Sequence, residues 1–241
     1  MKNISLAIAG AACVALGGVS SVQAATLIDT GGNGGNGGTF SPFGETFNSS
    51  FGQTFTVGSD NILNDFTFWL NDRTNPDAVD FAAYVMAWDG TKATGSIIYQ
   101  SSPQSTNGAS GFEQFTFNTG GTNLTSGQQY VAFLSTFGLL DGITGQAQMG
   151  ASFTRTYSGG EAVYTSTNFD PSSPNNSWIK PEAFGLGTFD AAFTANLSSA
   201  SAQPVPEPSS SLGLLVFGGF VAGKVLKRKK AQLKIESQDK E

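Results

Sequence analysis

The chain of 241 residues contains no histidine and a single cysteine, Cys13. Without histidine it cannot form an imidazole-based catalytic triad, an imidazole zinc site or a histidine switch near neutral pH. Cys13 lies in an N-terminal segment that is predicted to be removed. The mature chain would then contain no disulfide, thiolate metal ligand or cysteine nucleophile, and its stability would have to come from a buried core.

Positive charge is also scarce outside the C-terminal end. Between Asp29 and Asp190 there are fourteen Asp and Glu residues but only four Lys and Arg, which gives this segment a net charge of −10. Such an acidic segment is unsuited to bind nucleic acid or anionic lipid headgroups. It suits a well-solvated exterior or the attraction of divalent cations. A basic cluster stands apart from it, between Lys224 and Lys234.

The N-terminus has the pattern of a secretory signal peptide. Lys2 gives a positive start, residues 4–19 are apolar, and Val22 and Ala24 are small residues at the −3 and −1 positions. We expect cleavage between Ala24 and Ala25 after export through the Sec-type machinery, so that residues 1–24 are lost. A spanning helix is the less favoured alternative, because the apolar run is short and contains glycine.

Residues 25–203 are predicted to form one exported all-β domain. Apolar residues recur with a period of two, as in Phe66, Phe68 and Leu70, and glycine- or asparagine-rich turns separate the strands. Residues 81–88 are apolar on both faces, as expected of a central strand. About nine or ten short strands predict an antiparallel β-sandwich of jelly-roll type, with a closed barrel as the alternative. The Gly/Asn-rich segment 31–38 is expected to be a flexible loop.

The C-terminal end combines three features in a fixed order. The first is a proline-stiffened extended motif made of Val205, Pro206, Glu207, Pro208 and Ser209. The second is an apolar run over residues 209–226, about 27 Å long as a helix, which is marginally long enough to span a membrane. The third is a basic stop made of Lys227, Arg228, Lys229 and Lys230, which is expected to keep residues 231–241 in the cytoplasm.

Together, residues 204–230 closely resemble the PEP-CTERM protein-sorting signal. The resemblance implies an exported protein of a bacterium that makes exopolysaccharide. It also implies recognition by an exosortase, a membrane-embedded, transpeptidase-like cysteine protease that cleaves near the Pro-Glu-Pro. The protein would be anchored in the cell envelope through its C-terminal helix before processing, and would reach the cell surface or the extracellular space after it. A permanent C-terminal anchor is the alternative, since residues 231–241 extend past the point where many members end.

Residues 53–57, 66–70 and 124–131 are more weakly similar to jelly-roll ectodomains that occur beside such anchors and have no assigned activity. Aromatic side chains suit the apolar face of a sugar ring. The aromatic candidates for such stacking are Trp69, Trp88, Trp178, Tyr84 and Tyr157. Trp178 is expected to be the exposed one, because it lies in the proline-, serine- and asparagine-rich segment 171–181. The alternative places Trp178 as a plug over the end of the sandwich.

The acidic segment 71–80 is a candidate for structural calcium. Calcium prefers six to eight oxygen ligands, and Asp72, Asp77 and Asp80 are the candidate ligands here. The segment lacks the ordered spacing of a known calcium loop, so a solvated turn is the favoured alternative. No other cofactor is indicated.

Two functions are favoured for the exported domain. One is a binding module for exopolysaccharide, and the other is a purely structural surface or matrix protein with no discrete ligand site. A glycoside hydrolase that uses two carboxylates is less favoured, because no Glu stands in a recognisable catalytic pattern. The sequence therefore predicts a non-enzymatic protein.

Overall fold

The computed structural model describes residues 25–31, 37–44, 48–72, 78–108, 111–143, 145–154, 157–165, 170–171, 173, 177–184 and 187–199. The chain divides into two units, Met1–Ala200 and Ser201–Glu241, and the described residues all lie in the first. The predicted signal peptide, sorting motif, apolar run, basic stop and tail lie outside them. Within the described ranges, no helix has the length and apolar character needed to cross a membrane.

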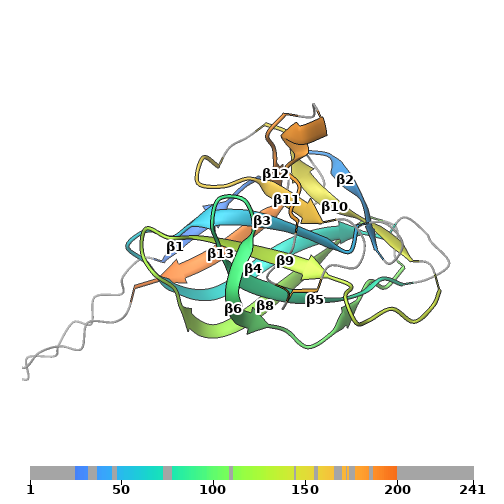
Figure 1. Cartoon of the computed structure of the whole chain (residues 1–241), viewed down its shortest axis with the longest axis horizontal. Coiled ribbons are helices and arrows are strands. Elements are labelled where there is room, and N and C mark those ends of the chain that lie inside the picture. Colours follow the sequence, from blue (N-terminus) through green and yellow to red (C-terminus); the bar gives the residue numbers. More distant parts are fainter. Residues whose placement is uncertain are drawn as a thin grey trace, which may run out of the picture. The chain divides into compact units, whose positions relative to one another are not determined.

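Nearly all regular structure in the described unit is β-strand. The elements are β1 Thr26–Asp29, β2 Thr39–Gly44, β3 Ser50–Thr56, β4 Ile62–Asn71, β5 Asp80–Trp88, β6 Ala93–Gln100, β7 Gln104–Ser105, β8 Phe112–Asn123, β9 Gln129–Ser135, β10 Gln146–Ser152, β11 Ala162–Thr165, the 3-10 helix η2 Pro181–Phe184, β12 Asp190–Ala191 and β13 Phe193–Ser198 (Figure 1).

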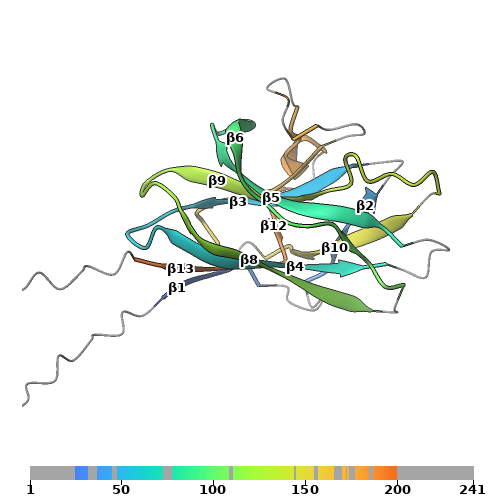
Figure 2. The same cartoon turned by 90° about the horizontal axis from the view of Figure 1, so that it is seen from below.

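These strands form two antiparallel sheets. The first sheet has the order β1-β13-β4-β10-β12, with β8 on the opposite edge of β4 and β2 paired to β10. The second has the order β11-β3-β9-β5-β6, with β7 paired to β5. Figure 2 shows the two sheets as two layers, with β3, β9 and β5 in one and β1, β13, β4 and β8 in the other. The prediction of an all-β fold with two antiparallel sheets is therefore confirmed.

The main core lies between the sheets and is rich in phenylalanine. On β4, Phe66, Phe68 and Leu70 are completely buried, as their alternation predicts. Aromatic rings meet across the layers: Phe55 of β3 lies 5.9 Å from Phe193 of β13, measured between ring centroids. Close aromatic pairs of this kind add to the free energy gained by burying apolar surface.

A second, smaller core covers the outer face of the second sheet. Tyr84, Met86 and Trp88 of β5 belong to it, whereas the alternate residues of the same strand face the main core. The prediction that β5 is apolar on both faces is thus confirmed. The cover includes the segment before η2, which joins β11 through a pair of backbone hydrogen bonds between Tyr164 and Ile179, 3.0 and 2.7 Å long.

Candidate functional site

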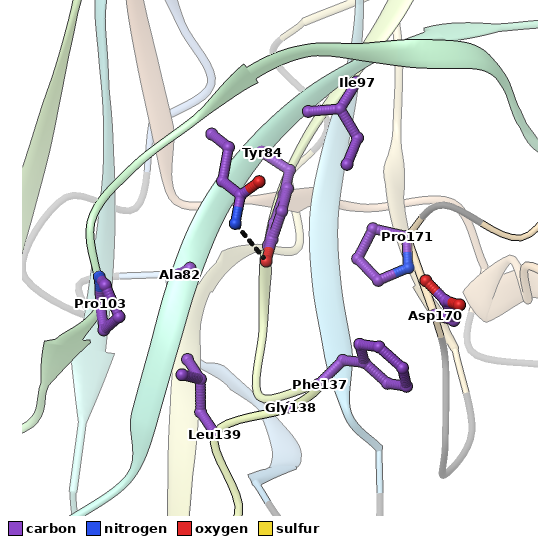
Figure 3. A pocket seen from close by; sticks show the side chains of 10 residues that line it. Ala82, Tyr84, Ile97, Pro103, Phe137, Gly138, Leu139, Asp170 and Pro171 are labelled. Carbon is purple, nitrogen blue, oxygen red and sulfur yellow. Dashed lines mark hydrogen bonds between the residues drawn. The ribbon is translucent and has the colours of Figure 1, made fainter.

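A hollow of about 340 Å³ opens on the outer face of the second sheet, beside this second core. Figure 3 shows its lining side chains. The lining residues are Ala82 and Tyr84 on β5, Ile97 and Gln100 on β6, Pro103 after β6, Phe137, Gly138 and Leu139 after β9, and Asp170 and Pro171. The lining therefore combines apolar surface with a hydroxyl, an amide and a carboxylate, a combination typical of small-ligand sites.

Tyr84 carries the hydroxyl of the hollow. Its ring stacks on Phe133 with centroids 5.2 Å apart and an angle of 16° between the planes. The Gln100 Nε2 donates a hydrogen bond of 3.3 Å to the Tyr84 hydroxyl (Figure 3). Burial raises the pKa of Tyr84 above its ordinary value of 10.0, and the negative charge of Asp170 raises it further. The hydroxyl thus keeps its proton at neutral pH and can donate a hydrogen bond to a ligand.

Phe137 is held at the corner of a tight turn. Leu139 N donates to the Thr136 carbonyl oxygen at 3.1 Å, and Gly138 adopts a φ of 74°. A positive φ at the third position is typical of a type II turn and favours glycine. The turn is also bonded to the end of β9, because Phe137 N donates a hydrogen bond to the buried Ser135 Oγ at 3.2 Å. Phe137 as a residue remains 39% exposed, so a partly exposed aromatic residue stands at the hollow.

Among the described residues that line the hollow, Asp170 is the charged one. Its backbone carbonyl oxygen accepts a hydrogen bond of 3.0 Å from Ser173 N. Figure 3 shows the Asp170 carboxylate and the Phe137 ring on the same side of the hollow.

The structure does not place Trp178 in the open. Only 9% of the residue is exposed, and its ring makes perpendicular contacts with Trp88 and Phe133, at centroid distances of 5.6 and 5.2 Å. The expectation of an exposed indole is therefore wrong: the residue plugs the outer face of the second sheet. It also lines a wider hollow of about 540 Å³ together with Lys180 and Glu182. The role of Trp178 as a ligand platform remains a prediction. Only the small exposed part of the residue, in the lining of this wider hollow, is open to a ligand.

The candidate calcium ligands are described in part. Asp77 lies outside the described residues. Asp72 is completely buried and accepts hydrogen bonds from Thr106 Oγ1 at 2.7 Å and Gly108 N at 3.0 Å, while Asp80 accepts one from Ser105 Oγ. Asp72 is therefore a clamp on the segment after β7 and not a solvated turn residue. Within the described ranges, no group of three or more acidic, histidine or cysteine side chains is arranged to hold a metal ion.

Sequence reasoning included Tyr84 among the aromatic candidates but did not single out Phe137, Gln100 or Asp170. The signal at Phe137 was a bulky apolar residue followed by glycine directly after the strand Gln129–Ser135, a place where a turn exposes it.

The described part of the chain thus belongs to the class of two-sheet antiparallel β-proteins, with a mixed apolar and polar hollow on one outer face. No protein family model, curated protein or solved structure matches this chain.

Proposed function

We propose that the chain is an exported, non-enzymatic protein of the bacterial cell envelope whose β-domain binds polysaccharide in the hollow beside Tyr84. The observation that supports this proposal is that one hollow is lined by a partly exposed aromatic residue, Phe137, and by the polar groups of Tyr84, Gln100 and Asp170. A pyranose presents an apolar face bordered by hydroxyl groups, and this lining offers a partner to each.

The place of the hollow in the domain also favours binding to an external polymer. Ser198, near the end of the described chain, pairs with Ile62 at the end of the sandwich where β3 turns into β4. The hollow lies toward the opposite end, where Ser135 pairs with Ala82. A domain tethered through its C-terminus would therefore keep the hollow away from the tether.

Binding is favoured over hydrolysis by the number of carboxylates. Hydrolysis of a glycosidic bond ordinarily needs two, roughly 5 to 9.5 Å apart. Among the described residues that line the hollow, only Asp170 has a carboxylate.

The strand order supports a finer description of the fold, the jelly roll. Eight strands, β1, β3, β4, β5, β6, β8, β9 and β13, pair in the orders β1-β13-β4-β8 and β3-β9-β5-β6. Two four-stranded sheets with this connectivity are the jelly-roll pattern, to which β2, β7, β10, β11 and β12 would be additions.

Delivery to the surface follows from the resemblance of residues 204–230 to the sorting signal. An exosortase would cleave near Pro206-Glu207-Pro208, so that the domain moves from a membrane-anchored form to the cell surface or the medium. The mass of the native protein tests this: a chain that still ends at Glu241 would leave the C-terminal segment as a plain anchor.

The binding proposal is tested by retention of the full chain, solubilised in detergent, on exopolysaccharide purified from the same bacterium. We expect saturable retention, weakened about tenfold by Phe137→Ala, because burying a phenylalanine side chain contributes about 1.5–3 kcal/mol. The matched control is Phe153→Ala, since Phe153 is 51% exposed and does not line this hollow.

Retention is measured with and without calcium. If retention requires calcium, residues 71–80 become the candidate site for a structural calcium ion. Absence of retention in both conditions would refute the proposal and leave a structural surface protein as the function.

A further inference from the structure

The outer face of the first sheet presents an array of polar side chains around a tryptophan. Phe66, Phe68 and Leu70 of β4 are buried in the core, so the alternate residues of this strand point outward. The register places β8 and β13 on the two sides of β4, with β1 beyond β13. The outward residues, named here the β4 face, are Leu27, Asp29, Asp65, Thr67, Trp69, Phe112, Gln114, Thr116, Asn118, Thr194 and Asn196.

Two aromatic residues lie together on the β4 face. Trp69 and Phe112 are both partly exposed. They meet at Gly150 of β10, where the place that a Cβ would take lies 3.5 Å from the Trp69 Cβ and 3.2 Å from Phe112 Cε1. Since Gly150 has no side chain, it leaves room for both aromatic residues on the same part of the sheet.

Hydrogen bonds order the polar side chains beside Trp69. The hydroxyl oxygens of Thr67 and Thr116 are 2.9 Å apart, and Gln114 Nε2 donates to Thr116 Oγ1 at 3.2 Å. Gln114, Thr116 and Asn118 are exposed, so hydroxyl and amide groups border the two aromatic residues at the surface. Sugar rings combine an apolar face with hydroxyl groups at the rim, and the β4 face offers a partner to each.

The charged groups of the β4 face favour an uncharged sugar chain. They are the carboxylates of Asp29 and Asp65, and no Lys or Arg belongs to this set of residues. Both carboxylates accept hydrogen bonds within the domain, Asp65 Oδ1 from Asn196 Nδ2 at 2.6 Å and Asp29 Oδ1 from Gly31 N at 2.8 Å. The segment from Asp29 to Asp190 has a net charge of −10, so an anionic polymer would be repelled on approach.

We propose that the β4 face is a second binding site, for a neutral polysaccharide, with Trp69 and Phe112 as its stacking platform. The hollow beside Tyr84 lies on the outer face of the other sheet, so the two sites occupy opposite sides of the two-layered domain (Figure 2). A domain with sites on opposite faces binds two polymer chains at once and links them. The inference rests on the proposed function for the class of ligand, and its residues are separate from those of the hollow.

The test is acrylamide quenching of tryptophan fluorescence in the full chain, solubilised in detergent. The chain has three tryptophans, and Trp88 and Trp178 are only 6% and 9% exposed, so quenching should come mainly from Trp69. Exopolysaccharide from the same bacterium is first separated by anion exchange into neutral and acidic fractions. We expect the neutral fraction to protect Trp69 from quenching and the acidic fraction not to. Protection should persist in Phe137→Ala and be absent in Trp69→Phe.

Retention and light scattering test the role of the site. Trp69→Ala should weaken retention on the neutral fraction about tenfold, whereas Phe153→Ala, outside the β4 face, should not. Micelles that hold one chain each should raise the light scattering of the dissolved polymer as its chains are linked. Either Trp69→Ala or Phe137→Ala should abolish this rise. The near-ultraviolet circular dichroism of the variants checks that they fold.

The outcomes separate this inference from the proposed function. Full retention with no protection of Trp69 by the neutral fraction would overturn the inference and leave binding in the hollow. Protection of Trp69 with no effect of Phe137→Ala on retention would keep the β4 face as a site, and would overturn both the hollow and the linking of chains. Protection that grows with protein concentration without polysaccharide would identify a second copy as the occupant and overturn the inference. If neither fraction is retained, both proposals fall.

Discussion

At the level of single residues, a polar link joins the two sheets inside the core. Gln53 of β3 and Asp190 of β12 are completely buried, and Gln53 Nε2 donates to Asp190 Oδ1 at 2.9 Å. Gln53 Oε1 accepts a hydrogen bond of 2.8 Å from Ala191 N. Gln53→Leu removes the donor and the acceptor together. We therefore expect it to lower the free energy of unfolding in urea by about 3 kcal/mol.

The matched control is Gln114→Leu, which changes the same residue type on an exposed position of β8. It should alter the free energy of unfolding by less than about 0.5 kcal/mol. If the two variants lose similar amounts of unfolding free energy, the buried hydrogen bonds of Gln53 contribute no net stability.

Single residues are also where the sequence was least informative. The polar surroundings of Trp178 in the chain predicted exposure, but its burial depends on contacts with Trp88 and Phe133, which are distant in the sequence. Asp72 shows the same limit: its acidic neighbours suggested a calcium loop, and its partners Thr106 and Gly108 come from another segment. Local composition cannot report long-range contacts of this kind.

At the level of elements, the turn that carries Phe137 depends on Gly138. Its φ of 74° is one that other residues adopt at a cost of about 1–2 kcal/mol. Gly138→Ala has open space around the added Cβ, so only the backbone conformation opposes it. We expect a loss of stability of about 1 kcal/mol and weaker retention on the polysaccharide as the turn shifts.

Gly58→Ala is the control for that prediction. Gly58 also has open space for a Cβ, but its φ lies outside the left-handed region. The substitution should have little effect on stability or on retention. If Gly138→Ala loses the expected stability but is retained on the polysaccharide as strongly as the unchanged protein, the position of Phe137 does not matter for binding.

The elements themselves were predictable where both faces of a strand obey a pattern. β4 and β5 followed from period-two burial and from a two-faced apolar run. β1, β2 and β6 were not predicted, since β1 and β6 are edge strands whose side chains are largely exposed. Glycine-rich residues do not always mark a turn between strands: Gly120 and Gly121 lie inside β8, with φ values of 71° and 85°, beside a register shift in the pairing with β4. Glycine there marks an irregular strand and not its end.

At the level of the whole molecule, the two-sheet fold has to be stable with few titratable groups near neutral pH. The chain has no histidine, and its acidic residues outnumber its basic ones by 18 to 12. A domain without imidazole has no side chain that ordinarily changes charge between about pH 5 and 8. Its stability across neutral pH should therefore be set by packing and not by titration.

The alkaline limit of stability should come from tyrosine. Burial raises the pKa values of Tyr84, Tyr99, Tyr157 and Tyr164 above 10.0. Above that pH the unfolded chain loses phenolic protons that the folded chain keeps, so the free energy of unfolding falls as pH rises. We expect urea midpoints to be flat from about pH 6 to 9 and to fall above pH 10, less steeply in Tyr99→Phe, which keeps the ring packed on Phe66. A fall within the neutral range, or an identical alkaline slope in Tyr99→Phe, would assign the limit to other groups.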